Sequence, residues 1–470
     1  MGITYHDQAA AVVDEPRVLE LLAVTRPPDR VRLEELLAKA RLLEGLSLEE
    51  VAELLAVDQP EGWEAVFAAA RAVKEGIYGR RMVLFAPLYI SNYCRNNCLY
   101  CGFRRDNTDL VRKTLSQEEV EQEIRAMLRQ GHKRTLLVAG EDPSRSGLDY
   151  LLETIRTVYS IREGKGEIRR LNVNVAPLQV EEYAELHAAG VGTYQCFQET
   201  YHRPTYAYMH PSGTKRDFDW RVSAFDRSMQ GGVDDVGLGV LFGLYDYRFE
   251  VLGLVSHAAY LDREYGVGPH TISFPRLEPA LNAPVAADPP YPISDEQVKQ
   301  VVAILRLAVP YTGIIMSTRE TPALRRTLCG LGVSQLSAGS RVHPGGYAEG
   351  PANITDEQQF FVGDTRSLDE VVRDLCDAGY LPSFCTACYR SGRTGEVFMG
   401  MAKPGEIQHF CAPNAMLTFE EYLLDYASPA TREAGARCLK QHLQELPERL
   451  QQATQERLAR VEAGERDVYL

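Results

Sequence analysis

The sequence predicts an α/β protein whose centre is a (β/α)8 barrel, preceded by a helical extension and followed by a mainly helical region. Between residues 82 and 342, short β-branched runs alternate with amphipathic helical patterns, as in the repeated βα units of a parallel sheet. Eight strands with intervening helices are the number that closes such a barrel. The predicted strands are Met82–Pro87, Arg134–Ala139, Arg170–Val175, Val191–Phe197, Asp235–Val240, His270–Phe274, Gly313–Ser317 and Val333–Ala338.

Helical periodicity defines the segments around and between these strands. Residues 1–77 carry helical patterns without alternation and predict an N-terminal helical cap. Ser116 and Glu119 have the spacing of a capping box at the start of the first barrel helix. We therefore expect the barrel to span 78–345 and a mainly helical C-terminal domain to span 346–470. The predicted helices are Leu33–Leu43, Leu48–Leu55, Trp63–Val73, Gln117–Arg129, Leu148–Ile161, Val180–Ala189, Phe249–Tyr265, Glu296–Ala308 and Pro322–Leu328.

Composition indicates a cytoplasmic enzyme. The chain has 470 residues, 45% of them hydrophobic, and a formal net charge of −14. Nucleic acid is not an expected ligand, because binding phosphates needs a basic face. No run of about 18 apolar residues occurs, so we expect no membrane span. Residues 1–17 lack an apolar signal region, which predicts a reducing compartment and thiolates that bind metal rather than form disulfides.

Six of the ten cysteines form two triads near opposite ends of the chain. A structural zinc site is closed by four ligands, whereas a cubane iron–sulfur cluster held by three cysteines leaves one iron open for a small molecule. Three thiolates in each group therefore favour clusters. For the first triad, a zinc site completed by a distant histidine, or unrelated core thiols, are the alternatives. The triads are Cys94, Cys98 and Cys101, spaced CxxxCxxC, and Cys385, Cys388 and Cys411, in which a CxxC pair precedes a more distant cysteine.

The first triad, with Tyr100 immediately before its last cysteine, resembles the signature of the radical S-adenosylmethionine (SAM) superfamily. The resemblance implies a [4Fe-4S] cluster on the three thiolates, with SAM chelating the fourth iron. It also implies that one electron from the cluster cleaves SAM to a 5'-deoxyadenosyl radical. It places Tyr100 near the adenine. After the second predicted strand, Gly140 and Glu141 resemble the superfamily element that accepts the SAM ammonium group, although Ala139 replaces its first glycine.

Polar residues at the ends of the next strands are further candidates for SAM binding. Asn172 and Asn174 lie on one face of strand three by period-two alternation, which suits hydrogen bonds to a ribose or amino acid but equally suits a polar barrel layer. Glu199 ends strand four. Arg221, on the helix that follows, could pair with the SAM carboxylate in two parallel hydrogen bonds, and a surface ion pair is its alternative.

The residues at the ends of strands seven and eight predict a binding site for a substrate carboxylate. Ser317 ends strand seven, Arg319 and Glu320 come directly after it, and Arg341 follows strand eight. Two arginines and several hydroxyls at neighbouring strand ends suit a carboxylate in a closed cavity. Arg319 and Arg341 are the expected anchors.

The second triad has a stronger zinc alternative, because His409 lies two residues before Cys411 and would complete a Cys₃His site. Arg390 and Arg393, by contrast, suggest a site that receives an anion or balances a negatively charged cluster. His270, at the start of strand six, is more often a core residue than a metal ligand when judged by sequence alone.

Longer sequence segments show a more specific resemblance. Residues 198–202, 245–248 and 337–341 resemble the aromatic-amino-acid lyases of the radical SAM superfamily, which include the thiamin-pathway tyrosine lyase ThiH. Residues 385–395, with the distant Cys411, are similar to the HydG family of [FeFe]-hydrogenase maturases. The likeness covers residues 78 to 426.

This family resemblance implies the activity and its cofactors. L-Tyrosine is cleaved at its Cα–Cβ bond to p-cresol and dehydroglycine, which becomes carbon monoxide and cyanide at a second [4Fe-4S] cluster held by the second triad. That cluster carries an additional labile iron, bridged by a free L-cysteine and held by a histidine, for which His270 is the expected ligand. The implied partners are a one-electron reductant of the flavodoxin or ferredoxin type and other hydrogenase maturation proteins.

Two alternatives stay open. A ThiH-type 2-iminoacetate synthase of thiamin biosynthesis would stop at dehydroglycine and would not need the second triad. An iron–sulfur carrier or scaffold would leave Glu141, Arg221, Arg319 and Arg341 without a role.

Overall fold

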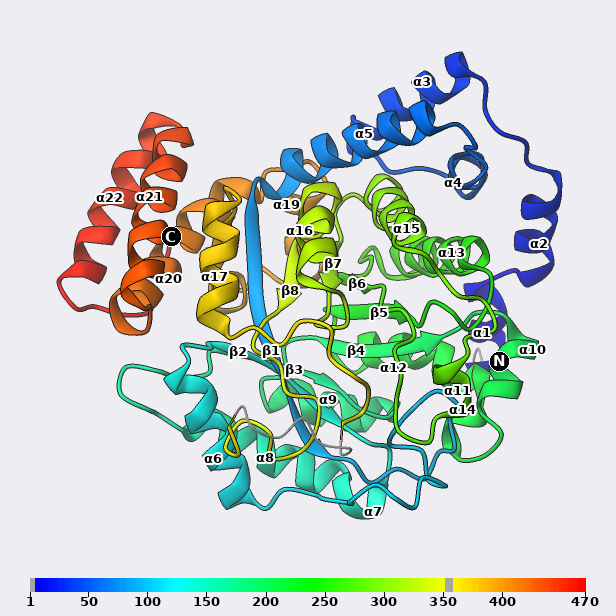
Figure 1. Cartoon of the computed structure of the whole chain (residues 1–470), viewed down its shortest axis with the longest axis horizontal. Helices are drawn as coiled ribbons and strands as arrows, with labels where there is room; N and C mark the ends of the chain where they lie inside the picture. Colours follow the sequence, from blue (N-terminus) through cyan, green and yellow to red (C-terminus); the bar gives the residue numbers. More distant parts are fainter. Residues whose placement is uncertain (1–4, 351–357) are drawn as a thin grey trace.

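The computed structural model describes residues 5–350 and 358–470, and a parallel β-barrel lies at its centre (Figure 1). The hydrogen-bonded strand order is β2-β3-β4-β5-β6-β7-β8-β1-β9, and an additional β2–β1 pairing closes the barrel. The predicted eight-stranded parallel barrel is confirmed. Its strands are β1 (Arg81–Ser91), β2 (Arg134–Ala139), β3 (Arg170–Asn174), β4 (Tyr194–Glu199), β5 (Val236–Val240), β6 (Thr271–Ser273), β7 (Gly313–Met316) and β8 (Gln335–Ser337).

The barrel strands are buried on both faces, which explains their nearly continuous apolar sequences. Every residue of β5, β6 and β7 is buried, between the packed interior and the surrounding helices. The parallel register brings the carboxyl ends of all eight strands to one end of the barrel, where the loops after β1, β2 and β4 meet.

A ninth strand, β9 (Leu381–Ser383), was not predicted from the sequence. It pairs in parallel with the start of β1, matching Arg81 to Leu381 and Val83 to Ser383, whereas β2 pairs with β1 only from Ala86 onward. A three-residue strand that contains proline has no alternating pattern to find. Because Cys385 follows two residues later, β9 fixes the second triad at the amino end of the barrel.

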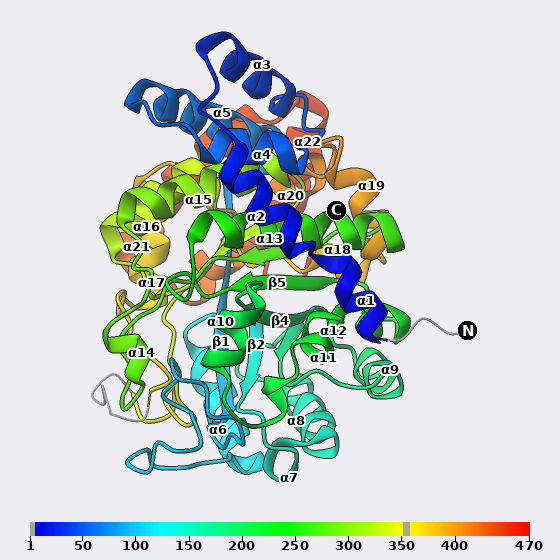
Figure 2. The same ribbon diagram turned by 90° about the vertical axis from the view of Figure 1, so that its right-hand side faces the viewer.

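The N-terminal helices pack against one side of the barrel (Figure 2). Helix α5 contacts α15 (Asp295–Ala308) and α16 (Pro322–Leu331), while α2 and α4 contact α13 (Tyr247–Tyr265). Ser47 and Glu50 form a capping box that begins α4, which satisfies backbone N–H groups in its first turn. These helices are α1 (Tyr5–Val12), α2 (Glu15–Val24), α3 (Arg30–Ala40), α4 (Leu48–Leu55) and α5 (Pro60–Tyr78).

Helices between the strands surround the barrel. The predicted capping box of Ser116 and Glu119 begins α6, and Gly266, at φ 68°, ends α13 in the left-handed conformation that glycine adopts without steric cost. The elements are α6 (Gln117–Arg129), α7 (Pro143–Ser146), α8 (Leu148–Ser160), α9 (Val180–Ala188), α10 (Arg203–Met209), the short 3₁₀ helix η1 (Thr214–Arg216), α11 (Phe218–Val222), α12 (Ala224–Gln230), α13 (Tyr247–Tyr265), α14 (Pro284–Ala287), α15 (Asp295–Ala308) and α16 (Pro322–Leu331).

A buried ion cluster attaches the C-terminal helices to the barrel. Glu421 of α20 lies 3.0 Å from the Lys133 ammonium and 2.9 Å from the Arg169 guanidinium, and none of the three side chains is more than 1% exposed. No helix in the described ranges is both long and apolar enough to span a bilayer. The C-terminal helices are α17 (Leu368–Asp377), α18 (Ala387–Arg390), α19 (Gly395–Ala402), α20 (Gln408–Asp425), α21 (Pro429–Glu445) and α22 (Glu448–Glu462).

Candidate active site

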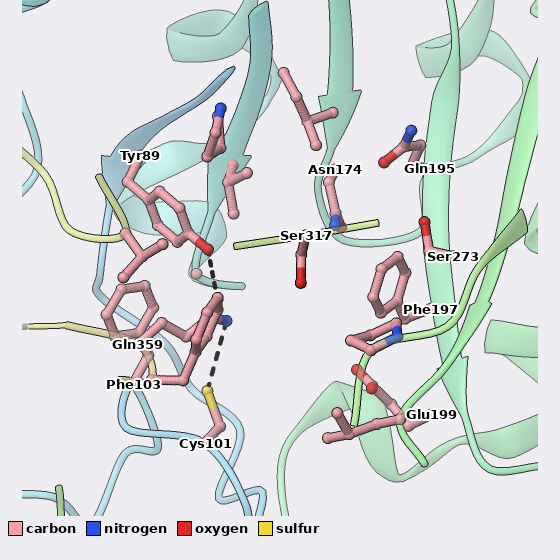
Figure 3. Close-up of a pocket in the computed structure, with 18 of the residues that line it drawn as sticks. Tyr89, Cys101, Phe103, Asn174, Gln195, Phe197, Glu199, Ser273, Ser317 and Gln359 are labelled. Carbon is pink, nitrogen blue, oxygen red and sulfur yellow. Dashed lines mark hydrogen bonds between the residues drawn. The ribbon is translucent and has the colours of Figure 1, made fainter. Parts of the chain in front are cut away.

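The first triad lines a cavity at the carboxyl end of the barrel, called the upper cavity below. It has a volume of about 200 Å³, and residues from the strands of the barrel and from the loops after them form its wall. Figure 3 shows Asn174, Gln195, Ser273 and Ser317 on one side of this space and Cys101 on the other. Polar and aromatic side chains thus face the thiols across a space large enough for small ligands.

Hydrogen bonds to neighbouring loops hold the cysteine loop in place. The Arg95 N–H donates to the Glu141 carbonyl, and the Leu99 N–H donates to the Met209 carbonyl. The Gln359 side chain, which accepts from the Tyr89 hydroxyl, donates to the Cys101 sulfur at 3.7 Å (Figure 3). The loop is therefore held by a contact at or next to each of its three cysteines.

Burial raises the pKa of all three thiols of the first triad, to about 11 for Cys94 and Cys101 and to about 12 for Cys98. Each thiol is therefore neutral near pH 7 and must release its proton when it binds metal. No group of three His, Cys, Asp or Glu within 5–350 and 358–470 converges on a single metal ion. A cubane places its thiolates on different irons, so it requires no such convergence.

Glu141 and Arg221, both predicted to bind SAM, form a buried ion pair in the upper cavity. Their side chains lie 2.8 Å apart, and the second Glu141 oxygen accepts from the Asn96 amide at 2.6 Å. Burial alone would raise the pKa of Glu141, but the charges of Arg221 and Lys215 hold it below its usual value. Because Asn96 lies between Cys94 and Cys98, this pair connects the cysteine loop to the barrel wall.

Glu199 lines the same cavity in an unusual backbone conformation. Its φ is 71°, a region that non-glycine residues seldom occupy and that persists where the surrounding structure enforces it. Its carboxylate pairs with the buried Lys215 ammonium. The Lys215 N–H donates in turn to Asn96, so Glu199 belongs to the same network as the Glu141–Arg221 pair.

Only some of the residues predicted to bind the substrate line the upper cavity. Ser317 and Arg319 line the upper cavity, and the Arg319 guanidinium lies over the Phe360 ring, 3.3 Å from its centroid. Glu320 points elsewhere, to Arg276 at 2.7 Å. Arg341 is not among the lining residues. Of the two proposed anchors, only Arg319 reaches the cavity.

Of the predicted SAM-binding residues, Asn172 alone lies outside the upper cavity, whereas Tyr100, Gly140 and Asn174 line it. Asn172 accepts a hydrogen bond from Arg170 at 3.0 Å, deeper in the barrel. The Tyr100 hydroxyl meets the buried His210 ring at 2.7 Å. The role of each residue stays a prediction.

The second triad lines another cavity, of about 50 Å³, at the amino end of the barrel, called the lower cavity below. His270 lines it as well, with its Nε2 3.1 Å from the Tyr389 hydroxyl. Burial lowers the pKa of His270, which keeps the ring neutral as a metal ligand must be. His409 is exposed and lies outside this cavity, so it is not placed to complete a Cys₃His zinc site there.

On several strands, the residues that line the two cavities are successive inward-facing residues, which we call a single step along the strand. On three of them, one inward-facing residue lines the lower cavity and the next, two positions on, lines the upper cavity. Side chains two residues apart on a strand are about 6.6 Å apart. These pairs, lower residue first, are Val83 and Phe85 on β1, Arg134 and Leu136 on β2, and Gln335 and Ser337 on β8.

Comparison with known proteins agrees with this architecture. The Radical SAM superfamily model matches residues 88–252, and the model of the Biotin and Thiamin Synthesis associated domain matches residues 273–381. The 2-iminoacetate synthases of Salmonella typhimurium and Escherichia coli are 32% and 35% identical, over 72% and 65% of this chain and 86% and 78% of theirs.

A crystal structure of HydG, described as a maturase of the [FeFe]-hydrogenase, is 48% identical with a TM-score of 0.95, covering 98% of this chain and 100% of that one. The chain belongs to the HydG family of radical SAM proteins. The HydG structure from Carboxydothermus hydrogenoformans gives a TM-score of 0.83 at 43% identity, covering 96% of this chain and 99% of that one.

Membership of the HydG family implies a [4Fe-4S] cluster and SAM, and the upper cavity fits both. Three thiols from one loop face it, as a cluster with one open iron requires. Glu141 and Glu199 offer carboxylates to an ammonium group, and Arg221 offers a guanidinium to a carboxylate.

Several residues of this HydG-family site could not be recognised as site residues from the sequence alone. Lys215, Asn96 and Gln359 contact the predicted residues directly, but none of them belongs to a motif with recognisable spacing. Arg81 and Arg134 also line the lower cavity, but the sequence placed Arg134 only in a strand and Arg81 just before one. Period-two alternation places such side chains inside the barrel but does not reveal a role.

Proposed function

We propose that this protein is a radical SAM lyase of [FeFe]-hydrogenase maturation. It cleaves L-tyrosine to p-cresol and dehydroglycine, and converts the latter at a second [4Fe-4S] cluster to the carbon monoxide and cyanide ligands of an iron complex. The observation that carries the proposal is a thiol triad in each of two cavities of one barrel. A one-electron reductant protein and the other hydrogenase maturation proteins are its partners.

In the upper cavity, Cys94, Cys98 and Cys101 hold the first cluster, while Glu141 and Arg221 orient SAM. Bound together there, this cluster and SAM would supply a carbon-centred radical for hydrogen-atom abstraction. The chain positions tyrosine for that step and excludes water. Aromatic side chains, among them Tyr89, Phe103, Phe197 and Phe360, line the cavity and suit a phenol ring.

Arg319 is the proposed anchor of the tyrosine carboxylate. Its guanidinium lines the upper cavity, and no ion pair joins it to a carboxylate within the described residues. Arg319→Ala removes one partner of a charge pair that is buried once substrate binds, a loss on the order of 3 to 5 kcal/mol. We expect the apparent KM for tyrosine to rise more than about a hundredfold.

SAM affinity, measured by calorimetry, is expected to change little in the Arg319 variant, which separates substrate binding from cofactor binding. Arg341→Ala serves as the matched control, since Arg341 lies outside the cavity lining. A normal KM for tyrosine in Arg319→Ala would place the anchor elsewhere.

In the lower cavity, Cys385, Cys388 and Cys411 hold the second cluster. With an additional labile iron and a free L-cysteine, this cluster supplies the metal that captures carbon monoxide and cyanide. Arg81 and Arg134 also line the cavity and offset the negative charge of thiolates and anions. His270, neutral and facing the same space, is the proposed protein ligand of the extra iron.

Substituting His270 is expected to loosen the extra iron and spare the cubane, because the cubane is held by three thiolates. His270→Ala should lose about one iron per chain while the iron of both cubanes is retained. Iron and sulfide counting, with electron paramagnetic resonance of both clusters, measures the change.

Tyr389→Phe is the control for the His270 variant, because it removes the hydroxyl that contacts the His270 ring and leaves both cysteine triads intact. Retention of the extra iron in His270→Ala would show that another residue binds it.

Anaerobic reconstitution, followed by incubation with SAM, reductant and tyrosine, tests the proposed activity as a whole. We expect p-cresol, 5'-deoxyadenosine, carbon monoxide and cyanide. Formation of p-cresol without the two diatomic products would instead support a 2-iminoacetate synthase, which the 35% identity to the Escherichia coli enzyme favours as the second candidate. Absence of SAM binding would support an iron–sulfur carrier.

A further inference from the structure

The loop that carries the first triad is basic, although the whole chain is acidic. Residues 92–113 contain five arginine or lysine residues and only two acidic ones, whereas the chain as a whole has a net charge of −14. The function proposed above does not use these charges, because none of the five basic residues lines the upper cavity. They are Arg95, Arg104, Arg105, Arg112 and Lys113.

Exposed arginines from two neighbouring segments lie against this loop. The backbone N–H of Arg105 donates to the Asn96 carbonyl at 2.8 Å, and its side chain is 53% exposed and pairs with the exposed Asp106 at 3.0 Å. Arg216, also exposed, ends η1, where the adjacent Lys215 N–H donates to the Asn96 side chain at 2.9 Å. Both arginines are therefore attached to the segment between Cys94 and Cys98, on the outer side of the loop.

An open apolar groove adjoins the same loop. Its volume is about 510 Å³, and its walls come from α10, α14 and the segment after α14. Tyr208 and Tyr291 line it and are 66% and 45% exposed, which is high for aromatic residues. Leu99 also lines it, held by backbone hydrogen bonds to Met209 and Val285.

Leu99 connects this groove to the first triad. It is the covalent neighbour of Cys98, one of the three proposed cluster ligands, and it is partly exposed while Cys98 is buried. A molecule seated in the groove would therefore be separated from the first cluster by about one residue. The opposite face of the cysteine loop is closed to a protein, because it forms the wall of the upper cavity.

We propose that this surface, made of the apolar groove and of Arg105 and Arg216, which lie against the same cysteine loop, docks the protein that delivers the electron to the first cluster. The partner is a small acidic one-electron carrier with an apolar contact patch. The carrier is oxidised by one electron and the cluster is reduced by one, with no bond formed or broken between the proteins. The inference rests on the proposed function in one respect, namely that the first triad holds a reducible cluster.

Charge complementarity identifies the occupant. An acidic carrier is repelled by most of this chain and attracted by the loop, which orients the encounter. Such steering raises association rates by about 10- to 1,000-fold at low ionic strength, and it is screened beyond about 8 Å at physiological salt. Small interfaces that combine an apolar centre with a charged rim suit transient electron-transfer encounters.

The test reverses charge at two sites that lie outside both cavities. The double variant Arg105→Glu and Arg216→Glu is compared with Arg449→Glu, an exposed arginine on α22 at the far side of the molecule (Figure 1). Reduction of the first cluster is followed in rapid-mixing experiments with a reduced flavodoxin and a reduced ferredoxin. The neutral small reductant photoreduced 5-deazariboflavin serves as a donor that needs no docking site.

We expect the double variant to be reduced by the protein donors at least tenfold more slowly at low ionic strength, with the difference shrinking as salt is added. Reduction by 5-deazariboflavin and the behaviour of Arg449→Glu should match the unmodified protein. Equal rates with the protein donors, or an equal loss with the small reductant, would overturn the docking surface alone. A cluster that 5-deazariboflavin cannot reduce in the unmodified protein would overturn the proposed function and this inference together.

Discussion

Replacing Cys94, Cys98 or Cys101 by alanine is expected to abolish SAM cleavage in each of the three variants. All three thiols line the upper cavity from a single loop, so two remaining thiolates cannot hold a cubane with one open iron. We expect 5'-deoxyadenosine formation to fall below detection and the iron content to fall by the iron of one cluster. Chromatography of 5'-deoxyadenosine after anaerobic incubation measures the effect.

A buried thiol outside the cavities provides the control for these three variants. Cys376 of α17 is buried and lines neither cavity, so Cys376→Ala should keep its iron and its activity. Production of 5'-deoxyadenosine in any first-triad variant would contradict the assignment of that cysteine.

A double change of Cys385 and Cys388 to alanine is expected to separate the two halves of the reaction. The second triad lines the lower cavity only, so SAM cleavage and tyrosine cleavage in the upper cavity should continue. p-Cresol should still form, while iron-bound carbon monoxide and cyanide should vanish because no metal remains to capture them. Infrared spectroscopy of the diatomic ligands, together with p-cresol quantification, measures both halves in one sample.

Folding and the first cluster must be intact for the double variant to be informative. Circular dichroism and the electron paramagnetic resonance signal of the SAM-bound first cluster provide that check. Loss of p-cresol in a folded variant with an intact first cluster would show that the second triad takes part in the cleavage step itself.

Most of the fold could be predicted because barrel strands and helices have different hydrophobic periods. The predicted helix Gln117–Arg129 matches α6 at both ends, since a capping box marks its start. Strand β9 could not be predicted, because Leu381–Ser383 is short, contains proline and is defined by its pairing with β1 rather than by its own pattern.

Some residues of the candidate site were easier to predict from the sequence than others. Motifs identified the cysteines and Glu141, position on the helix after strand four identified Arg221, and the structure brings all of these into the two cavities. Position at a strand end was a weaker guide, because it does not fix which way a loop side chain turns. Glu320 pairs with Arg276 and Arg341 stays outside the lining, although both follow strands whose ends reach the cavity.

The single step between the two cavities bears on how fast a small product could pass from one to the other. On β1, β2 and β8, the side chains that bound the lower cavity are immediate inward-facing neighbours of those that bound the upper cavity. A molecule of a few atoms would therefore have to pass only one layer of inward-facing side chains. Collective opening of the barrel, which takes microseconds to milliseconds, would not be required. Under the function proposed above, a reactive imine that crosses this single layer would stay inside the barrel, away from bulk water.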